Sequence, residues 1–234
     1  MLFRSTTQAA YVFMYVACHA DILHQVLVKG QTVGAFDCLA KDEIQVTSLG
    51  GGPGSDLLAL VGLIRSLRPD ERPKRIKYRV LDKQPNWHEI LKAVAVGQRG
   101  TVDIDVSFQQ VDVTVPDEWK NITCVNDNLL IMNFFVSEVC VLREAQSVRQ
   151  CLENLLGTVS GGATVVFNDS KFPSCYDYFD ARVAAANGFA RLVVESSRLD
   201  ATTDFDEFFR ECMVRFDRTP KLGSNAAYRV LKKQ

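Results

Sequence analysis

The sequence predicts an α/β fold with a mostly parallel sheet and helices on both of its faces. Short apolar, β-rich runs recur along the chain, and helix-like stretches separate most of them. A glycine cluster joins the first of these runs to a helix-like segment. With 234 residues, 47% of them hydrophobic, the chain is long enough for one domain with a large core. This alternation of strands and helices is typical of parallel sheets, which bind ligands at the carboxyl ends of their strands.

The chain is organised around residues 44–60, IQVTSLGGGPGSDLLAL. A short apolar run enters a cluster of glycines, and Ser55 with Asp56 opens a segment of helical apolar spacing, which indicates strand, tight turn and helix. Glycine is needed where φ is positive or where the backbone lies close to a ligand, and the following helix offers unpaired N–H groups. We therefore expect a ligand on this turn; the alternative is a tight turn without one.

The spacing of the glycines narrows the kind of ligand. Dinucleotide sites use G-x-G-x-x-G, and no G-x-x-x-x-G-K-[ST] phosphate loop is present. The spacing here resembles motif I of class I (Rossmann-like) S-adenosylmethionine-dependent methyltransferases. That resemblance implies S-adenosyl-L-methionine as cofactor, bound by Gly50, Gly51, Gly52 and Gly54. The family usually has an acid two positions before the first glycine, where this chain has Ser48, which we also take as a cofactor-binding candidate.

Polar residues after the next two strands extend the predicted cofactor site. Asp82 ends the strand predicted over 78–81, where the resemblance implies a carboxylate on the ribose hydroxyls, and Lys83 follows it. Asp112 stands where the family reads the adenine amino group, with Val113 offering a backbone N–H and an apolar face. Alternatively, Asp82 caps a helix and Asp112 is an ordinary loop residue. The order of the three motifs along the chain favours the cofactor site.

Further apolar runs complete the predicted sheet. They lie at residues 104–106, 129–132 and 163–167, and helices are expected over 138–156 and 176–189. The segments MVRFD (213–217) and AAYRVL (226–231) resemble the closing antiparallel hairpin of the methyltransferase fold. We therefore expect a Rossmann-like, seven-stranded, mostly parallel sheet with helices on both faces and an antiparallel C-terminal hairpin.

The fourth strand and its exit suggest catalytic residues. Asn133 and Phe134 occupy the motif IV region, where amino methyltransferases often carry N/D-P-P-Y/F, although both prolines are missing. We take Asn133 and Phe134 as catalytic candidates, with Asn133 also against the cofactor, and add Asp169 at the end of the fifth strand. The alternative for Asp169 is a turn and helix cap. A general base cannot be chosen among His88, Asp169 and Glu138.

Residues 44–169 are also similar to the eukaryotic large-subunit ribosomal RNA uridine-N3 methyltransferases and their relatives. This resemblance implies methyl transfer to RNA, on a base nitrogen or a hydroxyl, and a role in RNA modification or rRNA processing. Ser48, the incomplete motif IV and the unplaced base also fit an alternative, a pseudoenzyme. In that alternative the chain is a methyltransferase-like scaffold for a protein partner, or a cofactor sensor.

The first 40 residues are predicted to form an N-terminal helical cap on a methyltransferase domain over 41–234. Tyr11, Met14, Cys18 and Ile22 recur at helical spacing, which favours a helix packed on the sheet. The basic start and apolar centre also resemble a secretory signal, but His19 interrupts the apolar run. We expect a core-facing helix and no membrane contact.

The net charge and the cysteine content exclude few classes of function. The net charge is -1, so a nucleic-acid partner would need a local patch such as residues 65–79, with seven Lys or Arg against two acids. That run leads into the start of a parallel strand, so it would lie at the edge of the sheet opposite the site. There it would form either a solvated surface or a docking segment remote from the site. The seven cysteines show no C-x-x-C and no zinc spacing, so we expect no metal. Their dispersed placement favours an intracellular protein of the nucleus or cytoplasm.

Overall fold

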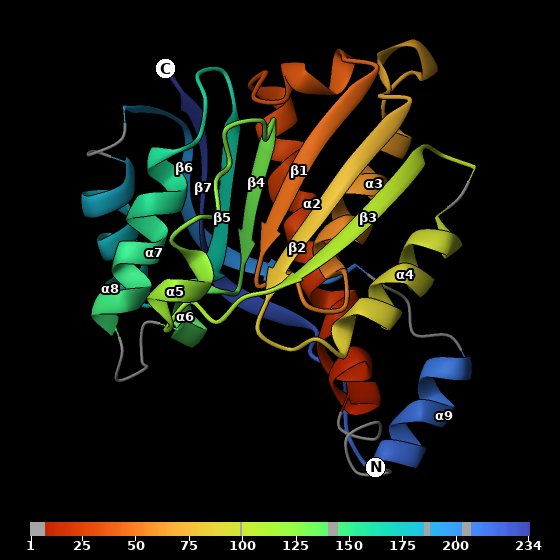
Figure 1. Ribbon diagram of the computed structural model, residues 1–234. Helices are drawn as coiled ribbons and strands as arrows, with labels where there is room; N and C mark the ends of the chain where they lie inside the picture. The colour runs from red at the N-terminus through yellow and green to blue at the C-terminus, as the bar shows by residue number, and fades with distance from the viewer. Residues whose placement is uncertain (1–7, 99, 140–144, 185–187, 203–206) are drawn as a thin grey trace.

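The computed structural model describes residues 8–98, 100–139, 145–184, 188–202 and 207–234. They form one seven-stranded sheet with the order β3-β2-β1-β4-β5-β7-β6 (Figure 1). The first five strands pair in parallel, and β7 lies antiparallel between β5 and β6. This confirms the predicted Rossmann-like, mostly parallel sheet with an antiparallel C-terminal hairpin. The strands are β1 (Glu43–Leu49), β2 (Arg75–Asp82), β3 (Asp103–Gln110), β4 (Leu129–Asn133), β5 (Thr164–Ser170), β6 (Phe189–Asp200) and β7 (Gly223–Lys233).

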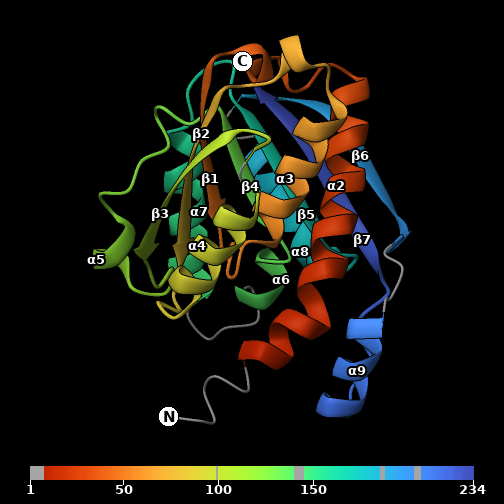
Figure 2. The same cartoon turned by 90° about the vertical axis from the view of Figure 1, so that its right-hand side faces the viewer.

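Helices cover both faces of the sheet, as Figures 1 and 2 show. One face carries α2 (Ala17–Thr32), α3 (Ser55–Ser66) and α4 (Trp87–Gly97), and the other carries α5 (Pro116–Trp119), α6 (Val136–Val139), α7 (Ala145–Gly157) and α8 (Pro173–Tyr178). A further helix, α9 (Glu207–Phe216), follows β6 and precedes β7 in the chain. Short turns of π-helix and 3-10 helix occupy Val12–Val16 (η1), Asp37–Ala40 (η2), Pro69–Glu71 (η3) and Phe179–Ala184 (η4).

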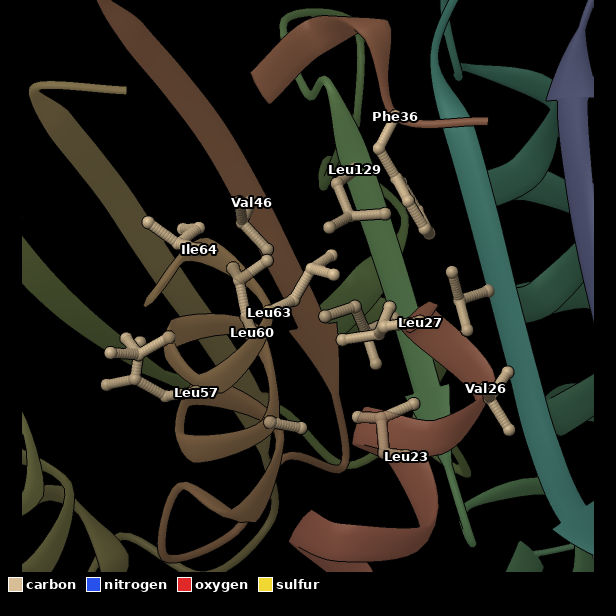
Figure 3. Close-up of a cluster of buried hydrophobic side chains, with 14 of the residues drawn as sticks. Leu23, Val26, Leu27, Phe36, Val46, Leu57, Leu60, Leu63, Ile64 and Leu129 are labelled. Atoms are coloured by element: carbon tan, nitrogen blue, oxygen red, sulfur yellow. The ribbon is translucent and has the colours of Figure 1, made fainter. Parts of the chain in front are cut away.

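The core divides into two layers because successive strand residues point to opposite faces. On one side Val46 and Leu129 pack with Leu27 and Leu60 of the helices, in the cluster drawn in Figure 3. On the other side, strand residues such as Leu130 pack under α7. Burying one aliphatic side chain of this size contributes about 1.5–3 kcal/mol. The two layers hold the strand ends, and therefore the site, in fixed positions.

The N-terminal helix runs from Gln8 to Thr32 and contributes to the core. Among the described residues it is the helix whose length and mean hydropathy of 1.3 would suffice to cross a membrane, a test that core helices and signal sequences also pass. Here Ile22, Leu23 and Val26 are fully buried against the sheet layer. Its first turns extend beyond the carboxyl ends of the parallel strands, next to α9, where Phe13 meets Phe216 (Figure 2).

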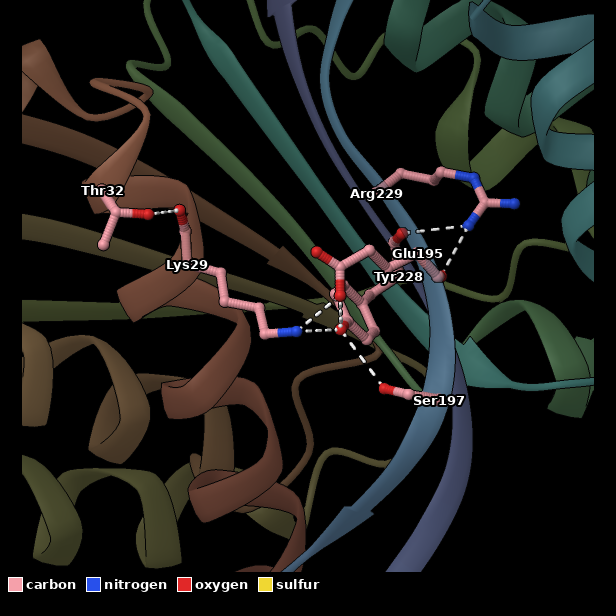
Figure 4. Close-up of polar contacts among 6 residues, drawn as sticks. All are labelled: Lys29, Thr32, Glu195, Ser197, Tyr228 and Arg229. Carbon is pink, nitrogen blue, oxygen red and sulfur yellow. Dashed lines mark hydrogen bonds and ion pairs between the residues drawn. The ribbon is translucent and has the colours of Figure 1, made fainter.

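Polar contacts also join α2 to the last two strands (Figure 4). Lys29 Nζ lies 2.5 Å from both Glu195 Oε2 on β6 and the hydroxyl of Tyr228 on β7. Arg229 donates from Nη1 to the backbone carbonyls of Glu195 and Tyr228, at 3.0 Å each. The two contacts of Lys29 connect residues that are 166 and 199 positions apart in the sequence.

Part of the predicted C-terminal organisation is wrong. AAYRVL lies within β7, but its hairpin partner is β6, whereas MVRFD belongs to α9 and the residue after it. The predicted helix over 176–189 is represented by α8 and η4 and is followed by a strand beginning at Phe189. The edge position of β6 explains the error, because much of this strand is exposed and lacks a continuous apolar run. The predicted helix over 138–156 includes 140–144, which lie outside the described residues.

Candidate functional site

A cleft of about 470 Å³ opens at the carboxyl ends of β1 and β2. Its walls come from the glycine turn, the loops after β2 and β3, the N-terminal helix and α6. A volume of this size is in the range of small-molecule sites. The residues that line it are Tyr11, Gly50, Gly52, Leu81, Asp82, Lys83, Gln84, Trp87, Val111, Asp112, Val113, Phe135, Glu138 and Val139.

The glycine turn forms the floor of this cleft. Gly50 has φ +70°, and a Cβ there would lie 2.3 Å from Cδ2 of Phe135, so a side chain is excluded. Gly52 has φ +48°, and a Cβ there would fit without a clash, at van der Waals distance from two residues that line the cleft: 3.8 Å from Trp87 Nε1 and 3.9 Å from Asp82 Oδ2. The absence of a side chain at Gly52 therefore keeps the floor of the cleft open for a ligand.

Gly51 and Gly54 serve the packing behind the turn. A Cβ on Gly51 would lie 2.2 Å from Ser48 Oγ, so strand and turn touch at this point. Gly54 has φ +102° and precedes α3, where a Cβ would press on Leu91 at 3.0 Å. Neither glycine lines the cleft, although the sequence predicted that all four would bind cofactor.

Asp82 lies at the mouth of the glycine turn. Its Oδ2 accepts a hydrogen bond from Gly52 N at 3.0 Å, and its Oδ1 accepts one from Gln84 N at 2.8 Å. Burial raises the pKa of this carboxyl group, against the opposing effect of these hydrogen bonds. Each carboxylate oxygen can accept a further hydrogen bond. Asp82 is therefore placed to receive ligand hydroxyl groups from the cleft.

The loops after β2 and β3 close the other wall. Lys83 Nζ lies 2.5 Å from Asp112 Oδ2, while Asp112 Oδ1 accepts hydrogen bonds from N and Oγ1 of Thr114. Burial acts to raise the pKa of Asp112, but the hydrogen bonds from Lys83 and Thr114 outweigh it and the pKa is lowered. Val113 adds a buried apolar side chain beside them. The structure thus brings Asp82, Lys83, Asp112 and Val113 together in the cleft.

Ser48 and Asn133 lie outside the cleft, in a buried polar network. Ser48 Oγ donates to Asp56 Oδ2 at 2.5 Å, and Asn133 Nδ2 donates to Asp56 Oδ1 at 2.9 Å. Asn133 Oδ1 accepts from Asn168 Nδ2 at 2.7 Å, which extends the network to β5. The side-chain amide of Asn133, a catalytic candidate from the sequence, is therefore hydrogen-bonded to internal partners.

Phe134 and Asp169, the other catalytic candidates, also do not line the cleft. Phe134 has φ +53°, which is unusual for a bulky residue, and it stacks on His19 with ring centroids 4.1 Å apart. Asp169 is fully buried, and its Oδ2 accepts from Ser137 N at 2.9 Å, at the start of α6. This contact joins the end of β5 to α6, which precedes β5 in the chain. Burial raises the pKa of Asp169 despite the hydrogen bonds.

Eight of the residues that line the cleft are not among the predicted site residues, and four of these eight carry an aromatic ring or a charge: Tyr11, Trp87, Phe135 and Glu138. Phe135, rather than Phe134, packs against the glycine turn, and Glu138 follows it on α6. Tyr11 enters from the N-terminal helix and lies 5.3 Å from the ring of Trp87. Enclosure in the cleft raises the pKa of Glu138, and the charges of Asp169 and Asp82 raise it further. Of these four, Glu138 was among the candidates for the general base, whereas Tyr11 was predicted only as part of a core-facing helix.

The basic run at residues 65–79 is far from this cleft in the fold, because it leads into the amino-terminal start of β2. Its charges are largely paired: Lys74 with Asp42, Lys77 with Glu43, and Arg75 with Asp105. Exposed pairs of this kind contribute roughly 0–1 kcal/mol each. They reduce the local excess of positive charge, as expected for a solvated surface.

Comparisons with known proteins support the fold. No family model and no curated protein match the sequence. Among solved structures, precorrin-6y C5,15-methyltransferase from Geobacter metallireducens matches with a TM-score of 0.50 at 10% identity, over 88% of each chain. A SAM-dependent methyltransferase from Methanosarcina mazei has a TM-score of 0.50 at 9% identity, over 82% of this chain and 93% of that one. The chain thus has the fold of S-adenosylmethionine-dependent methyltransferases, while the uridine-N3 branch has no support from these matches.

The residues of the cleft fit S-adenosylmethionine. The open floor at Gly52 leaves room for a ligand backbone, and the carboxylate of Asp82 can accept hydrogen bonds from ribose hydroxyls. Val111, Val113 and Val139 provide apolar surface for a planar ring. Acidic groups outnumber basic ones in the lining, which suits a ligand that carries positive charge.

Proposed function

We propose that this protein binds S-adenosylmethionine in the cleft and transfers its methyl group to an acceptor. The observation that carries the proposal is the carboxylate of Asp82 beside the open glycine floor, at the carboxyl end of a parallel sheet. When bound there, the cofactor would supply an electrophilic methyl group on a sulfonium. Asp82 would hold the ribose, while Val113 and the loop around Asp112 would hold the adenine.

The chain's own contribution to the reaction is alignment and proton removal. A displacement at a methyl carbon is accelerated when the nucleophile is held in line at close distance. Glu138 is a carboxylate that forms no ion pair with the described part of the chain, and its raised pKa suits a proton acceptor. We assign it the role of general base for an acceptor that must lose a proton.

The acceptor that we propose is RNA, at a base nitrogen or a hydroxyl. The support is the similarity of residues 44–169 to rRNA uridine-N3 methyltransferases. The acidic lining of the cleft suits a neutral base entering alone, so backbone phosphates would have to stay outside. Transfer of radiolabelled methyl groups to total RNA, followed by nucleoside analysis, tests this acceptor.

A second candidate function is a methyltransferase-like module that binds a protein partner or senses the cofactor. The observation that favours it is the internal bonding of Asn133, whose amide makes hydrogen bonds to Asp56 and Asn168. In this candidate the cofactor cleft is retained and no strand-end amide is presented to an acceptor. Cofactor binding without methyl transfer to RNA, protein or small molecules would favour it.

Isothermal titration with S-adenosylmethionine and S-adenosylhomocysteine tests the cofactor site directly. We expect micromolar binding by the wild type and about 100-fold weaker binding by Asp82→Ala, since the variant loses a ligand contact and the Gly52 hydrogen bond. Asp42→Ala, which removes an exposed carboxylate near the opposite edge, is the matched control and should bind normally. Absence of binding by the wild type would contradict the proposed function.

A further inference from the structure

A buried carboxylate lies directly behind the glycine turn. Asp56 is only 1% exposed, and all its described hydrogen-bond partners are neutral. Ser48 Oγ lies at 2.5 Å, Asn133 Nδ2 at 2.9 Å and Ser55 Oγ at 3.1 Å. Hydrogen bonds from three neutral groups orient this carboxylate, but they supply no positive charge.

No ion pair joins Asp56 to a lysine, arginine or histidine in the parts of the chain that the structure describes. A buried carboxylate without a counter-ion is costly, so such groups are normally paired or neutralised. Burial raises the pKa of Asp56 to about 6, which still leaves the group mainly ionised at neutral pH. The fold therefore keeps a negative charge here with nothing in the described chain to balance it.

The charge of Asp56 reaches the cleft as well as the core, where burial and then Asp56 raise the pKa of Tyr78. Ser48, the neighbour of Asp56, touches Gly51, the residue between the two glycines of the cleft floor. Burial raises the pKa of Tyr11, which lines the cleft, and the charges of Glu138 and Asp56 raise it further. Burial likewise raises the pKa of Asp56, with a smaller contribution from the charge of Asp82. Two carboxylates thus flank the glycine turn, Asp82 at the cleft and Asp56 behind the floor.

We propose that Asp56 is a positioning residue that supplies the counter-charge for the α-ammonium group of the ligand's amino-acid portion, across the glycine turn. The inference rests on the proposed function, since it takes S-adenosylmethionine as the ligand. Asp56 is too deeply buried for direct contact, so it acts through the electrostatic potential of the floor. The ligand supplies the positive charge that the described chain lacks near Asp56. The negative potential of Asp56 therefore attracts the ammonium end of the ligand to the glycine turn.

The substitution Asp56→Asn removes the negative charge of this side chain and keeps its shape. The new amide oxygen can accept from Asn133 Nδ2 and Ser55 Oγ, while its nitrogen donates to Ser48 Oγ, which reverses the direction of that one hydrogen bond. The variant thus keeps the three contacts and removes the charge. We expect about tenfold weaker binding of both S-adenosylmethionine and S-adenosylhomocysteine, because both carry the ammonium group. Binding of 5′-methylthioadenosine, which lacks it, should stay within about twofold of the wild type.

Two measurements keep the result interpretable. Circular dichroism and urea unfolding should show that Asp56→Asn is folded. Asp127 is a buried acid at the amino-terminal edge, so Asp127→Asn removes the same charge far from the cleft and should bind the ligands normally. Equal affinities of wild type and a folded Asp56→Asn for all three ligands would overturn this inference alone. A loss confined to S-adenosylmethionine would overturn the assignment to the ammonium. A wild type that binds none of the ligands would overturn the proposed function together with it.

Discussion

The two halves of the sheet's carboxyl edge use their polar residues differently. At the ends of β1 and β2, and in the loop after β3, the half that we call the open half, Asp82, Lys83 and Asp112 line a cleft. At the ends of β4 and β5, the closed half, Asn133 and Asp169 are buried and bonded to other parts of the chain. The open half is organised to receive a ligand, whereas the closed half is organised to hold the strand ends together.

The comparison shows why a residue's place in a motif does not establish its task. In this fold the exit of every parallel strand reaches the same edge, so each strand-end side chain is a candidate for chemistry. Which candidates face a ligand depends on the hydrogen-bond partners behind them. The side-chain amide of Asn133 donates a hydrogen bond to Asp56, and the carboxylate of Asp169 accepts one from the backbone N–H of Ser137. Neither polar group is therefore free to turn toward the cleft.

The largest effect is expected from removing Asn133 in the closed half. Asn133→Ala deprives the Asp56 carboxylate of a hydrogen bond and leaves the side-chain amide of Asn168 without its described acceptor. We expect a loss of about 4 kcal/mol in the free energy of unfolding, measured by urea denaturation. The exposed Asn126→Ala should change stability by less than about 0.5 kcal/mol. An equally small effect of Asn133→Ala would contradict a structural role for the closed half.

The next effect is a dependence of stability on pH that comes from Asp56. Its pKa is about 6 in the folded protein, above the ordinary value of 3.8, so the folded state binds the proton more tightly than the unfolded state. This contribution to stability is full below about pH 4 and is lost as the pH rises through about 6, by about 3 kcal/mol in total.

Asp56→Asn should flatten that part of the pH profile, measured by urea unfolding between pH 4 and 7. The pKa values of Asp82, Glu138 and Asp169 are also raised, so the variant should retain a shallower slope of the same sign. An unchanged profile in the variant would mean that Asp56 does not titrate in this range.

The smallest effect concerns Glu138 in the open half. If Glu138 accepts the proton of the acceptor, Glu138→Gln should lower kcat about tenfold, equivalent to about 1.4 kcal/mol, while cofactor affinity stays within about twofold. Initial rates of methyl transfer and titration of the cofactor measure the two quantities separately. Gln84→Ala, another change in the cleft lining, provides the comparison for a merely altered surface. A matched loss of affinity and rate would assign Glu138 to binding instead.

The sequence predicts the open half well because its signals are local. A glycine cluster between an apolar run and a helical pattern specifies a turn, and Asp82 follows its strand immediately. The alternation of strands and helices predicts that the first five strands are parallel, and the structure confirms this.

The closed half could not be predicted in the same way. The positive φ of Phe134 has no sequence signal, yet it turns Phe134 onto His19 and brings Phe135 to the glycine turn. Asp56 has the position of an ordinary first-turn acid of a helix, and only its contact with Ser48 reveals another role. Such partners lie far apart along the chain, as Asn133 and Asp56 do, so a local pattern does not reveal them.

The position of β7 has a consequence for the order in which the molecule can form. Residues 164–170 pair on one side with β4 and on the other with residues 223–233, which a ribosome produces much later. Until then, β5 would present an unpaired edge next to buried side chains such as Val165 and Phe167. Lys29 likewise cannot meet Glu195 and Tyr228 before that stage. A nascent chain of about 200 residues should therefore depend on chaperones until its last strand emerges.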